Sequence, residues 1–168
     1  GGEWKAKPTK FGPLPRVWAK YKGLYHYGKR IVLSYSVGTG EVLESPWAKK
    51  AAGSVVFSRS FEIRGLDNTE FLLLAQSPQG GGVGAVRKVK GIKMAVIPRS
   101  KKSGDSTVIA ATVLDDGNSI GVDGHRAIAK VKGGNSQFTI LLWEGPEKEL
   151  ESFALYAKKK FVSPELVK

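Results

Sequence analysis

Short stretches in which apolar and polar residues alternate recur along most of this chain, and each is closed by turn-forming residues. Residues 31–37 place an apolar or aromatic side chain at every second position, and residues 55–63 repeat the pattern. Successive side chains of a β-strand point to opposite faces, so a period of two predicts a strand with one buried face. The alternation excludes a mainly helical fold.

Further segments of this kind follow at near-regular spacing, at residues 41–44, 70–76, 92–97, 107–114, 126–131 and 137–143. About eight or nine short strands bounded by Gly, Pro, Asn or Asp are typical of antiparallel sandwiches, with barrels as the second choice. Only the segment after Pro146 has apolar residues at helical spacing. We therefore predict an all-β fold, an antiparallel two-layer, jelly-roll-like β-sandwich, with one C-terminal helix near residues 147–160.

Three connecting segments carry expectations of their own. Residues 18–27 are rich in aromatic side chains and are expected to begin with a short helical turn. Residues 46–53 are expected to form a loop, because proline and glycine bound them. Residues 79–84 contain four glycines in six positions and are expected to form a flexible loop.

The chain divides into three regions by composition. Residues 1–17 are polar and contain three prolines, which predicts an extended lead-in. Residues 18–145 hold the predicted sandwich, and residues 146–168 hold the helix and the start of a linker. The first residues include neither an initiator Met nor a signal peptide, so we expect the chain to be part of a larger protein.

The buried core is predicted from the apolar positions of the strands. Residues 70–76 read as a fully apolar strand at the centre of the sandwich, because apolar side chains fall on both of its faces. The predicted core residues are Leu33, Tyr35, Phe57, Phe61, Leu72, Leu74, Val113, Ile128, Ile140 and Leu142.

Composition narrows the possible partners. The chain has no Cys, which excludes disulfides, thiolate metal sites and cysteine nucleophiles. No apolar run approaches the length of a membrane-spanning helix, which needs about 18 residues. The net charge of +12 favours acidic partners such as nucleic acid, anionic polysaccharide or an acidic protein. Lys outnumbers Arg, which suits a soluble basic surface better than nucleic-acid recognition.

No catalytic or cofactor motif is present. His26 and His125 lack a second histidine at metal-ligand spacing, so we predict no metal site. The glycines of residues 79–84 are not followed by the Lys-Ser or Lys-Thr pair of a phosphate-binding loop, and no cofactor is predicted. Residues 115–118 and Asp123 could supply oxygen ligands to Ca²⁺, but Asp-Gly and Asn are ordinary turn chemistry.

A carboxylate pair could make the domain a sugar-active enzyme. Glu41, Glu44 and Glu62 are the candidates for acid and base. Glu41 and Glu44 are three positions apart on one strand, so they should point to opposite faces. This spacing counts against them as a catalytic pair.

Aromatic residues provide the main candidate binding site. Trp18, Tyr21 and Tyr25 fall in the aromatic-rich segment, and Trp47 is expected to be exposed in a loop. Aromatic faces stack on sugar rings, although the same rings could cap one end of the core. Arg59 interrupts an apolar row, so it either pairs with Glu41 or Glu44 or faces a ligand. These five residues form the predicted ligand-binding set.

The sequence Gly-Pro-Leu-Pro-Arg-Val-Trp at residues 12–18, with the predicted hairpin that follows, carries a resemblance over residues 11–76. It resembles a domain of unknown function in large exported bacterial multidomain proteins. There the domain typically precedes a β-propeller similar to soluble sugar dehydrogenases, often with a c-type haem-binding module. The resemblance implies a periplasmic or extracellular location and contact with those neighbours. It supplies no catalytic residues, and the absence of Cys places any haem elsewhere in the parent protein.

These observations favour a non-catalytic accessory module of an exported protein. Such a module would dock a neighbouring propeller or electron-transfer domain, or bind carbohydrate. Two alternatives remain open: a sugar-active enzyme domain, and a basic module that binds nucleic acid or an anionic polymer.

Overall fold

The computed structural model of the chain describes residues 17–77, 82–100, 106–114 and 118–159. Several predicted features lie outside the described residues: the lead-in at residues 1–16, the linker at 160–168, the turn at 115–117, and most of the glycine-rich loop.

Eleven strands and one α-helix make up the described residues. The first strands are β1 (Ala19–Tyr27), β2 (Arg30–Val37), β3 (Gly40–Ala51), β4 (Ser54–Leu66), β5 (Glu70–Gln76) and β6 (Ala85–Val89). They are followed by β7 (Ile92–Ser100), β8 (Thr107–Leu114), β9 (Ser119–Asp123), β10 (Arg126–Val131) and β11 (Gly134–Pro146). A short 3₁₀ turn (Glu147–Glu149) leads into α1 (Leu150–Lys158).

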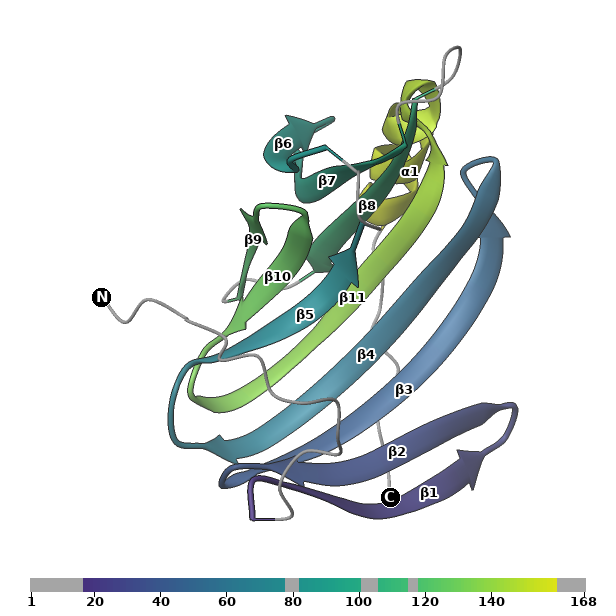
Figure 1. The fold of residues 1–168 in the computed structure, drawn as a ribbon. Coiled ribbons are helices and arrows are strands. Elements are labelled where there is room, and N and C mark those ends of the chain that lie inside the picture. The colour runs from purple at the N-terminus through teal and green to yellow at the C-terminus, as the bar shows by residue number, and fades with distance from the viewer. Residues whose placement is uncertain (1–16, 78–81, 101–105, 115–117, 160–168) are drawn as a thin grey trace.

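The strands form two antiparallel sheets of unequal size. The large sheet has eight strands in the order β1-β2-β3-β4-β11-β8-β7-β6, and the small sheet has three in the order β5-β10-β9. The small sheet lies across one face of the large one, toward the β11, β8 and β7 side, and leaves β1, β2 and β3 beside it (Figure 1). The all-β class, the sandwich-like arrangement and the C-terminal helix are therefore confirmed.

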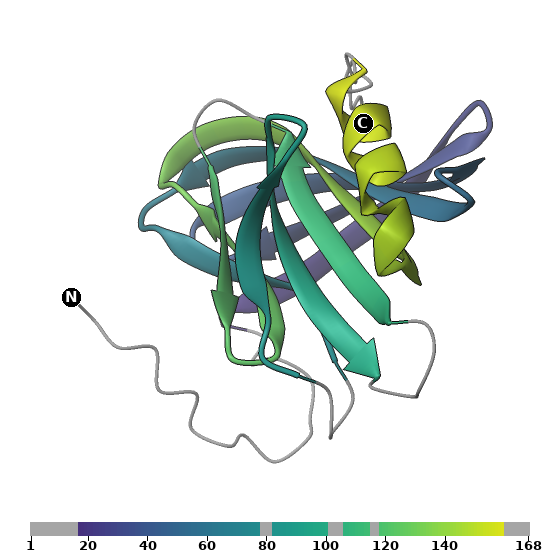
Figure 2. The ribbon, with the colours of Figure 1, turned by 90° about the horizontal axis from the view of Figure 1, so that it is seen from above.

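We call the face of the large sheet that is turned to the small sheet the inner face, and the opposite face the outer face. Figure 2 shows that α1 lies on the outer side, away from β5, β9 and β10. Residues directly paired on neighbouring antiparallel strands share a face, so the register assigns every strand residue to one face.

The inner core fills the space between the two sheets. It is built from alternate residues of the strands in both layers: Val42, Phe61, Ile63, Leu66, Leu74, Ala95, Ile97, Ala111, Ile120, Ala127, Ala129, Val131, Phe138 and Ile140. Phe61 and Phe138 pair directly across β4 and β11, and their rings stack with centroids 5.0 Å apart. The burial of these rings ties β4 and β11 to the layer above them.

The outer core packs α1 onto the large sheet. Leu150, Phe153, Ala154 and Ala157 are the buried residues of the helix, the apolar positions that gave the helical spacing. Phe153 stacks on Trp143 of β11 with ring centroids 5.5 Å apart. At the start of the 3₁₀ turn, hydrogen bonds from Arg87 and Ser106 lower the pKa of the Glu147 carboxyl.

The tip of the β3–β4 hairpin corrects the loop predicted at residues 46–53. The strands continue to Ala51 and restart at Ser54, with only Ala52 and Gly53 between them. Both turn residues have positive φ, at 51° and 70°, as a tight two-residue hairpin turn requires. The Trp143 indole donates a hydrogen bond to the Ala52 carbonyl at 3.1 Å. A contact from a residue 91 positions away thus supports a turn that lacks the usual turn sequence.

Three further expectations are wrong. Residues 19–27 form strand β1 rather than beginning with a helical turn, because residues 19–21 at its start already pair with β2. Strand β5 is not central: it is an edge of the small sheet, and Phe71 and Leu73 are 48% and 50% exposed. Phe57 is 54% exposed rather than buried, because the small sheet does not extend fully over its position on the inner face.

Of the other predicted core residues, Phe61, Leu74 and Ile140 are buried. The remainder are partly buried, namely Leu33, Tyr35, Leu72, Val113, Ile128 and Leu142.

Candidate functional site

The inner face of β1 to β4 combines a buried polar network with exposed aromatic rings. Its rows follow from the register. Tyr21 is opposite Tyr35, which is opposite Val42. Farther along the strands, Pro46 is opposite Arg59. Tyr21 of β1 and Arg59 of β4 are therefore both on the inner face. Tyr21 is level with Ile63 near the end of β4, and Arg59 is four residues before Ile63.

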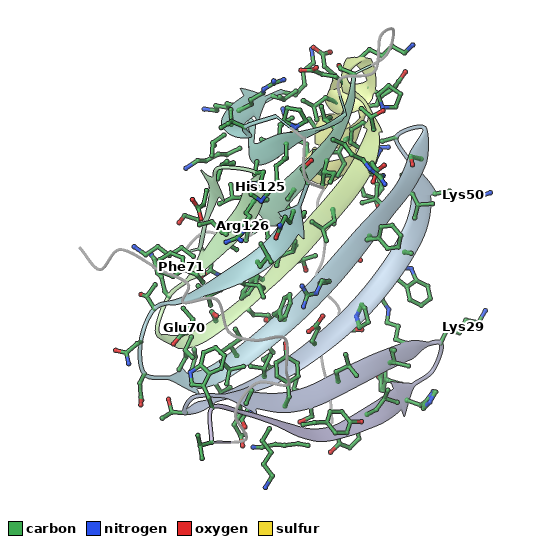
Figure 3. All side chains as sticks on the ribbon, viewed as in Figure 1. Lys29, Lys50, Glu70, Phe71, His125 and Arg126 are labelled. Atoms are coloured by element: carbon green, nitrogen blue, oxygen red, sulfur yellow. The ribbon has the colours of Figure 1, made fainter. Side chains whose placement is uncertain are left out.

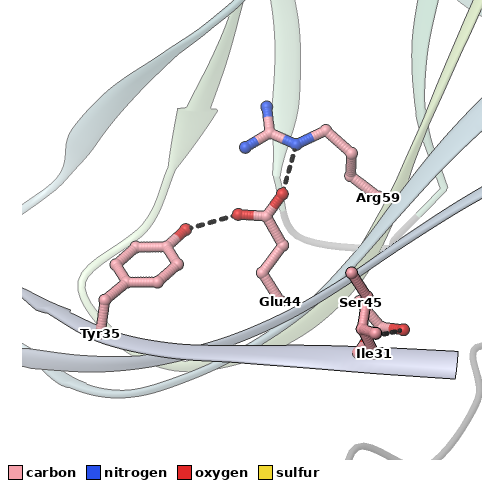
Figure 4. A network of polar contacts seen from close by, with 5 residues as sticks. All are labelled: Ile31, Tyr35, Glu44, Ser45 and Arg59. Carbon is pink, nitrogen blue, oxygen red and sulfur yellow. Dashed lines mark hydrogen bonds and ion pairs between the residues drawn. The ribbon is translucent and has the colours of Figure 1, made fainter. Parts of the chain in front are cut away.

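A buried carboxylate holds a polar network at the centre of this face (Figure 4). Glu44 is 6% exposed. Its Oε1 accepts a hydrogen bond from Arg59 Nε at 2.6 Å, and its Oε2 accepts one from the Tyr35 hydroxyl at 2.8 Å. The Arg59 pairing expected from the sequence is thus made with Glu44. Both carboxylate oxygens are occupied, which a buried charge requires.

The surroundings of Tyr35 keep its hydroxyl protonated. Burial raises the pKa of the Tyr35 phenol well above its usual value, and the negative charge of Glu44 raises it further. The hydroxyl therefore acts as a permanent donor to Glu44 across the ordinary pH range. A carboxylate held by an ion pair and by a donor that does not ionise is fixed in position.

The guanidinium of Arg59 is held on two sides. Nε binds Glu44, and the group lies over the ring of Phe61, 5.0 Å from its centroid. Figure 4 draws no contact between Glu44 and the two terminal nitrogens, since Arg59 is bound to the carboxylate through Nε. In the part of the chain that the structure describes, neither of these nitrogens has a hydrogen-bond partner. The Arg59 side chain remains 28% exposed, so these donors are accessible.

An apolar pocket of about 250 Å³ adjoins the network. Tyr35 and Phe61 belong to both, and Trp18 lines the pocket. The remaining lining residues come from both sheets and are Val37, Val42, Ile63, Leu66, Glu70, Phe71, Leu72 and Val131. Among the described residues that line the pocket, Glu70 is the only one with a charged side chain. In Figure 3, Glu70 and Phe71 lie at the start of β5, at the edge of the small sheet.

Phe57 is a candidate ligand-binding residue, although the sequence pattern predicted that it would be part of the core. It lies two residues before Arg59 on β4, so both side chains are on the inner face. Its ring is 54% exposed beside the polar network. The alternating pattern predicts its face correctly, but only the extent of the small sheet decides whether that position is covered.

The five predicted site residues do not form one surface. Tyr21 and Arg59 lie on the inner face, and Trp18 lines the inner pocket. Tyr25 is paired with the buried outer residue Val32, so it lies on the outer face. Trp47 also lies on the outer face, in strand β3 rather than in a loop, and the Arg30 guanidinium sits 4.9 Å from its ring centroid. A shift in the β1–β2 register between Tyr21 and Gly23 separates Tyr21 from Tyr25.

The three carboxylates considered for catalysis are also divided. Glu44 faces inward, whereas Glu41 and Glu62 lie on the outer face with ion-pair partners Lys22 and Arg64. Glu44 therefore cannot act with either of them across one cleft. Within the described residues, no group of three or more His, Asp or Glu side chains is placed to hold a metal ion.

His125 lies in the connection between β9 and β10 (Figure 3). Its Nε2 is 3.2 Å from the Gln76 side-chain nitrogen at the end of β5. This contact gives it a local partner. None of the described helices is long and apolar enough to cross a membrane.

Comparison with known proteins gives one family match. The model of a family described as a domain of unknown function (DUF6797) matches residues 1–44. The match includes Trp18, Tyr21 and Tyr25 and ends inside β3, at the buried Glu44. No curated protein and no solved structure matches the chain. The resemblance to a domain of unknown function is thus supported over this N-terminal quarter.

Proposed function

We propose that this domain is a non-catalytic module that binds carbohydrate along the inner face of β1 to β4. The observation that carries the proposal is the arrangement of exposed aromatic rings around a fixed polar network. Sugar rings have an apolar face that stacks on aromatic side chains and hydroxyls that need directed hydrogen bonds. The inner face offers both kinds of contact side by side.

The aromatic contribution comes from Trp18, Tyr21 and Phe57. Their exposed fractions are 42%, 65% and 54%, and large exposed aromatic residues are the usual anchors of binding surfaces. They bracket the polar network from both ends of β4. Exposed rings flanking hydrogen-bond donors suit a ligand with alternating apolar and hydroxylated surfaces.

The spacing of these residues favours an extended ligand. Tyr21 shares its row with Ile63, six residues from Phe57 on β4. At the usual rise of a strand, that separation is about 20 Å. A chain of several sugar rings fills such a distance, whereas a single small molecule does not.

The polar groups suit binding better than turnover. Glu44 is buried with both oxygens occupied, so it can neither attack a glycosidic bond nor protonate a leaving group without breaking its network. A glycosidase needs a second carboxylate across the cleft, about 5–10 Å away. Glu41 and Glu62, on the other face, cannot take that role.

The test combines a glycan array with calorimetry of the strongest ligand. Phe57→Ala and Trp18→Ala should each weaken binding by about three- to tenfold, the range for one aromatic contact. Tyr27→Ala is the matched control, because Tyr27 is 61% exposed but lies on the outer face. Equal affinity in all three folded variants would contradict the inner-face site. Hydrolysis of the bound glycan by the isolated domain would instead favour the enzyme alternative.

A second candidate function is docking of a neighbouring domain through the outer face. Tyr25, Tyr27 and Trp47 are 38%, 61% and 39% exposed there, and Arg30 stacks on Trp47. Aromatic residues and Arg are enriched in protein interfaces. The resemblance suggests a propeller or a haem-binding module of an exported parent as the partner. A pull-down with that neighbour should weaken with Trp47→Ala and be unaffected by Phe57→Ala.

A further inference from the structure

The centre of the inner face is locally neutral, whereas the whole chain is strongly basic. The chain carries a net charge of +12, which by itself favours an anionic ligand. The cation at the centre of the inner face, however, is Arg59, and its charge is balanced by the buried Glu44 at 2.6 Å. What the site presents is therefore a pair of N–H donors without a net charge.

Two Lys side chains illustrate where unbalanced positive charge lies. Lys29 and Lys50 project from the tips of the β1–β2 and β3–β4 hairpins, at the margin of the molecule (Figure 3). Charges separated by more than about 8–10 Å are largely screened at physiological salt. Lys50 is four residues along β3 from Pro46, the residue opposite Arg59, a separation of about 13 Å at the usual rise of a strand, so its charge is largely screened at the Arg59 donors.

We propose, as a refinement that rests on the carbohydrate-binding function above, that Glu44 makes the inner face selective for neutral rather than acidic glycans. Glu44 is a positioning residue: it holds Arg59 by Nε and leaves both terminal nitrogens available to a ligand. Two parallel N–H donors can bind the oxygens of a pair of neighbouring sugar hydroxyls, which accept hydrogen bonds as carboxylate oxygens do. The carboxylate of an acidic sugar would, in addition, meet the negative charge of Glu44 behind the guanidinium.

The apolar environment strengthens this discrimination. Phe61 beneath the guanidinium and the adjoining pocket, whose lining is almost wholly apolar, reduce the contact of the network with water. Electrostatic effects are larger in such surroundings than in water. An acidic group that approaches Arg59 would lose its hydration. Because the charge of Arg59 is already paired with Glu44, this loss would not be compensated, and binding would be unfavourable.

The experiment uses a glycan array printed with neutral oligosaccharides together with uronic acid and sulfated oligosaccharides. The wild-type domain should bind neutral glycans, with an affinity that changes less than about twofold between roughly 0.05 and 0.5 M salt. Glu44→Gln keeps the size of the side chain but leaves the Arg59 charge uncompensated. It should raise affinity for acidic glycans about fivefold, the upper range for a partly exposed ion pair, and make that binding sensitive to salt.

Glu62→Gln is the matched control. It makes the same change of charge on the outer face, where Glu62 pairs with Arg64, so the preference for neutral glycans should be unchanged. If Glu44→Gln does not fold, the glycan array of the wild type and the salt dependence of its binding still test whether neutral glycans are preferred. Preferential, salt-sensitive binding of acidic glycans by the wild type would overturn the charge argument while leaving carbohydrate binding intact. An absence of binding to every glycan would overturn the proposed function, and this inference with it.

Discussion

Leu74 and Leu73 are neighbours on β5 with opposite environments, and they allow a sharp test of the two-layer fold. Leu74 is 8% exposed and belongs to the inner core, whereas Leu73 is 50% exposed. Leu→Ala removes three carbon atoms, which at about 0.8 kcal/mol per buried CH₂ gives about 2.4 kcal/mol for transfer to water. The cavity left at Leu74 adds to this cost, so Leu74→Ala should destabilise the domain by about 3 kcal/mol.

The same substitution at Leu73 should cost less than about 1 kcal/mol, because water already reaches half of that side chain. Urea denaturation followed by tryptophan fluorescence measures both values. For a chain of this length, about 3 kcal/mol corresponds to a fall in Tm of about 6–12 °C. Equal destabilisation by the two substitutions would mean that β5 is covered on both faces. The small sheet would then not have one face on the inner core and one face in water, as the structure has it.

Two further predictions concern stability. The raised pKa of Tyr35 means that the unfolded chain ionises first, so the stability associated with this residue is intact below about pH 10 and decreases as pH rises above it. The free energy of unfolding, measured by denaturation at several pH values from 9 to 11, should therefore fall more steeply with pH for the wild type than for Tyr35→Phe. An identical dependence on pH in the two proteins would contradict the burial of the phenol. Gly145→Ala would place a methyl group against the buried ring of Trp143 and should destabilise by at least about 1–3 kcal/mol, as overpacking does. Gly121→Ala is its control, since its new carbon meets Ile128 at an ordinary 3.6 Å, and an equal Tm change in both variants would contradict the clash.

Some elements could be predicted because their signal is local. The helix of residues 150–158 shows its apolar spacing in the sequence, and all four positions of that spacing are buried. The strand at residues 30–37 likewise follows from alternation. The segment 19–27 was misassigned because aromatic residues on both of its faces obscure the period of two.

The candidate site could be predicted only in part. The presence of Arg59 in an apolar row indicated that it needs a partner, and Glu44 was one of two named candidates. The choice between Glu41 and Glu44 depends on the β3–β4 register, which sets Glu44 opposite Phe61 and so on the inner face with Arg59. Register is fixed by pairing along the whole hairpin, and no local pattern reports it.

The antiparallel strands, the C-terminal helix and the lack of any disulfide or thiolate site all follow from the sequence alone. The alternation of side chains and the absence of Cys are enough for those conclusions. Only the tertiary structure sets how much of one apolar face is covered. Phe61 is buried and Phe57 is exposed, although both side chains are on the inner face of β4. The physical reason is that a period of two defines two faces, whereas burial depends on how far a second layer, built from distant strands, extends over each of them.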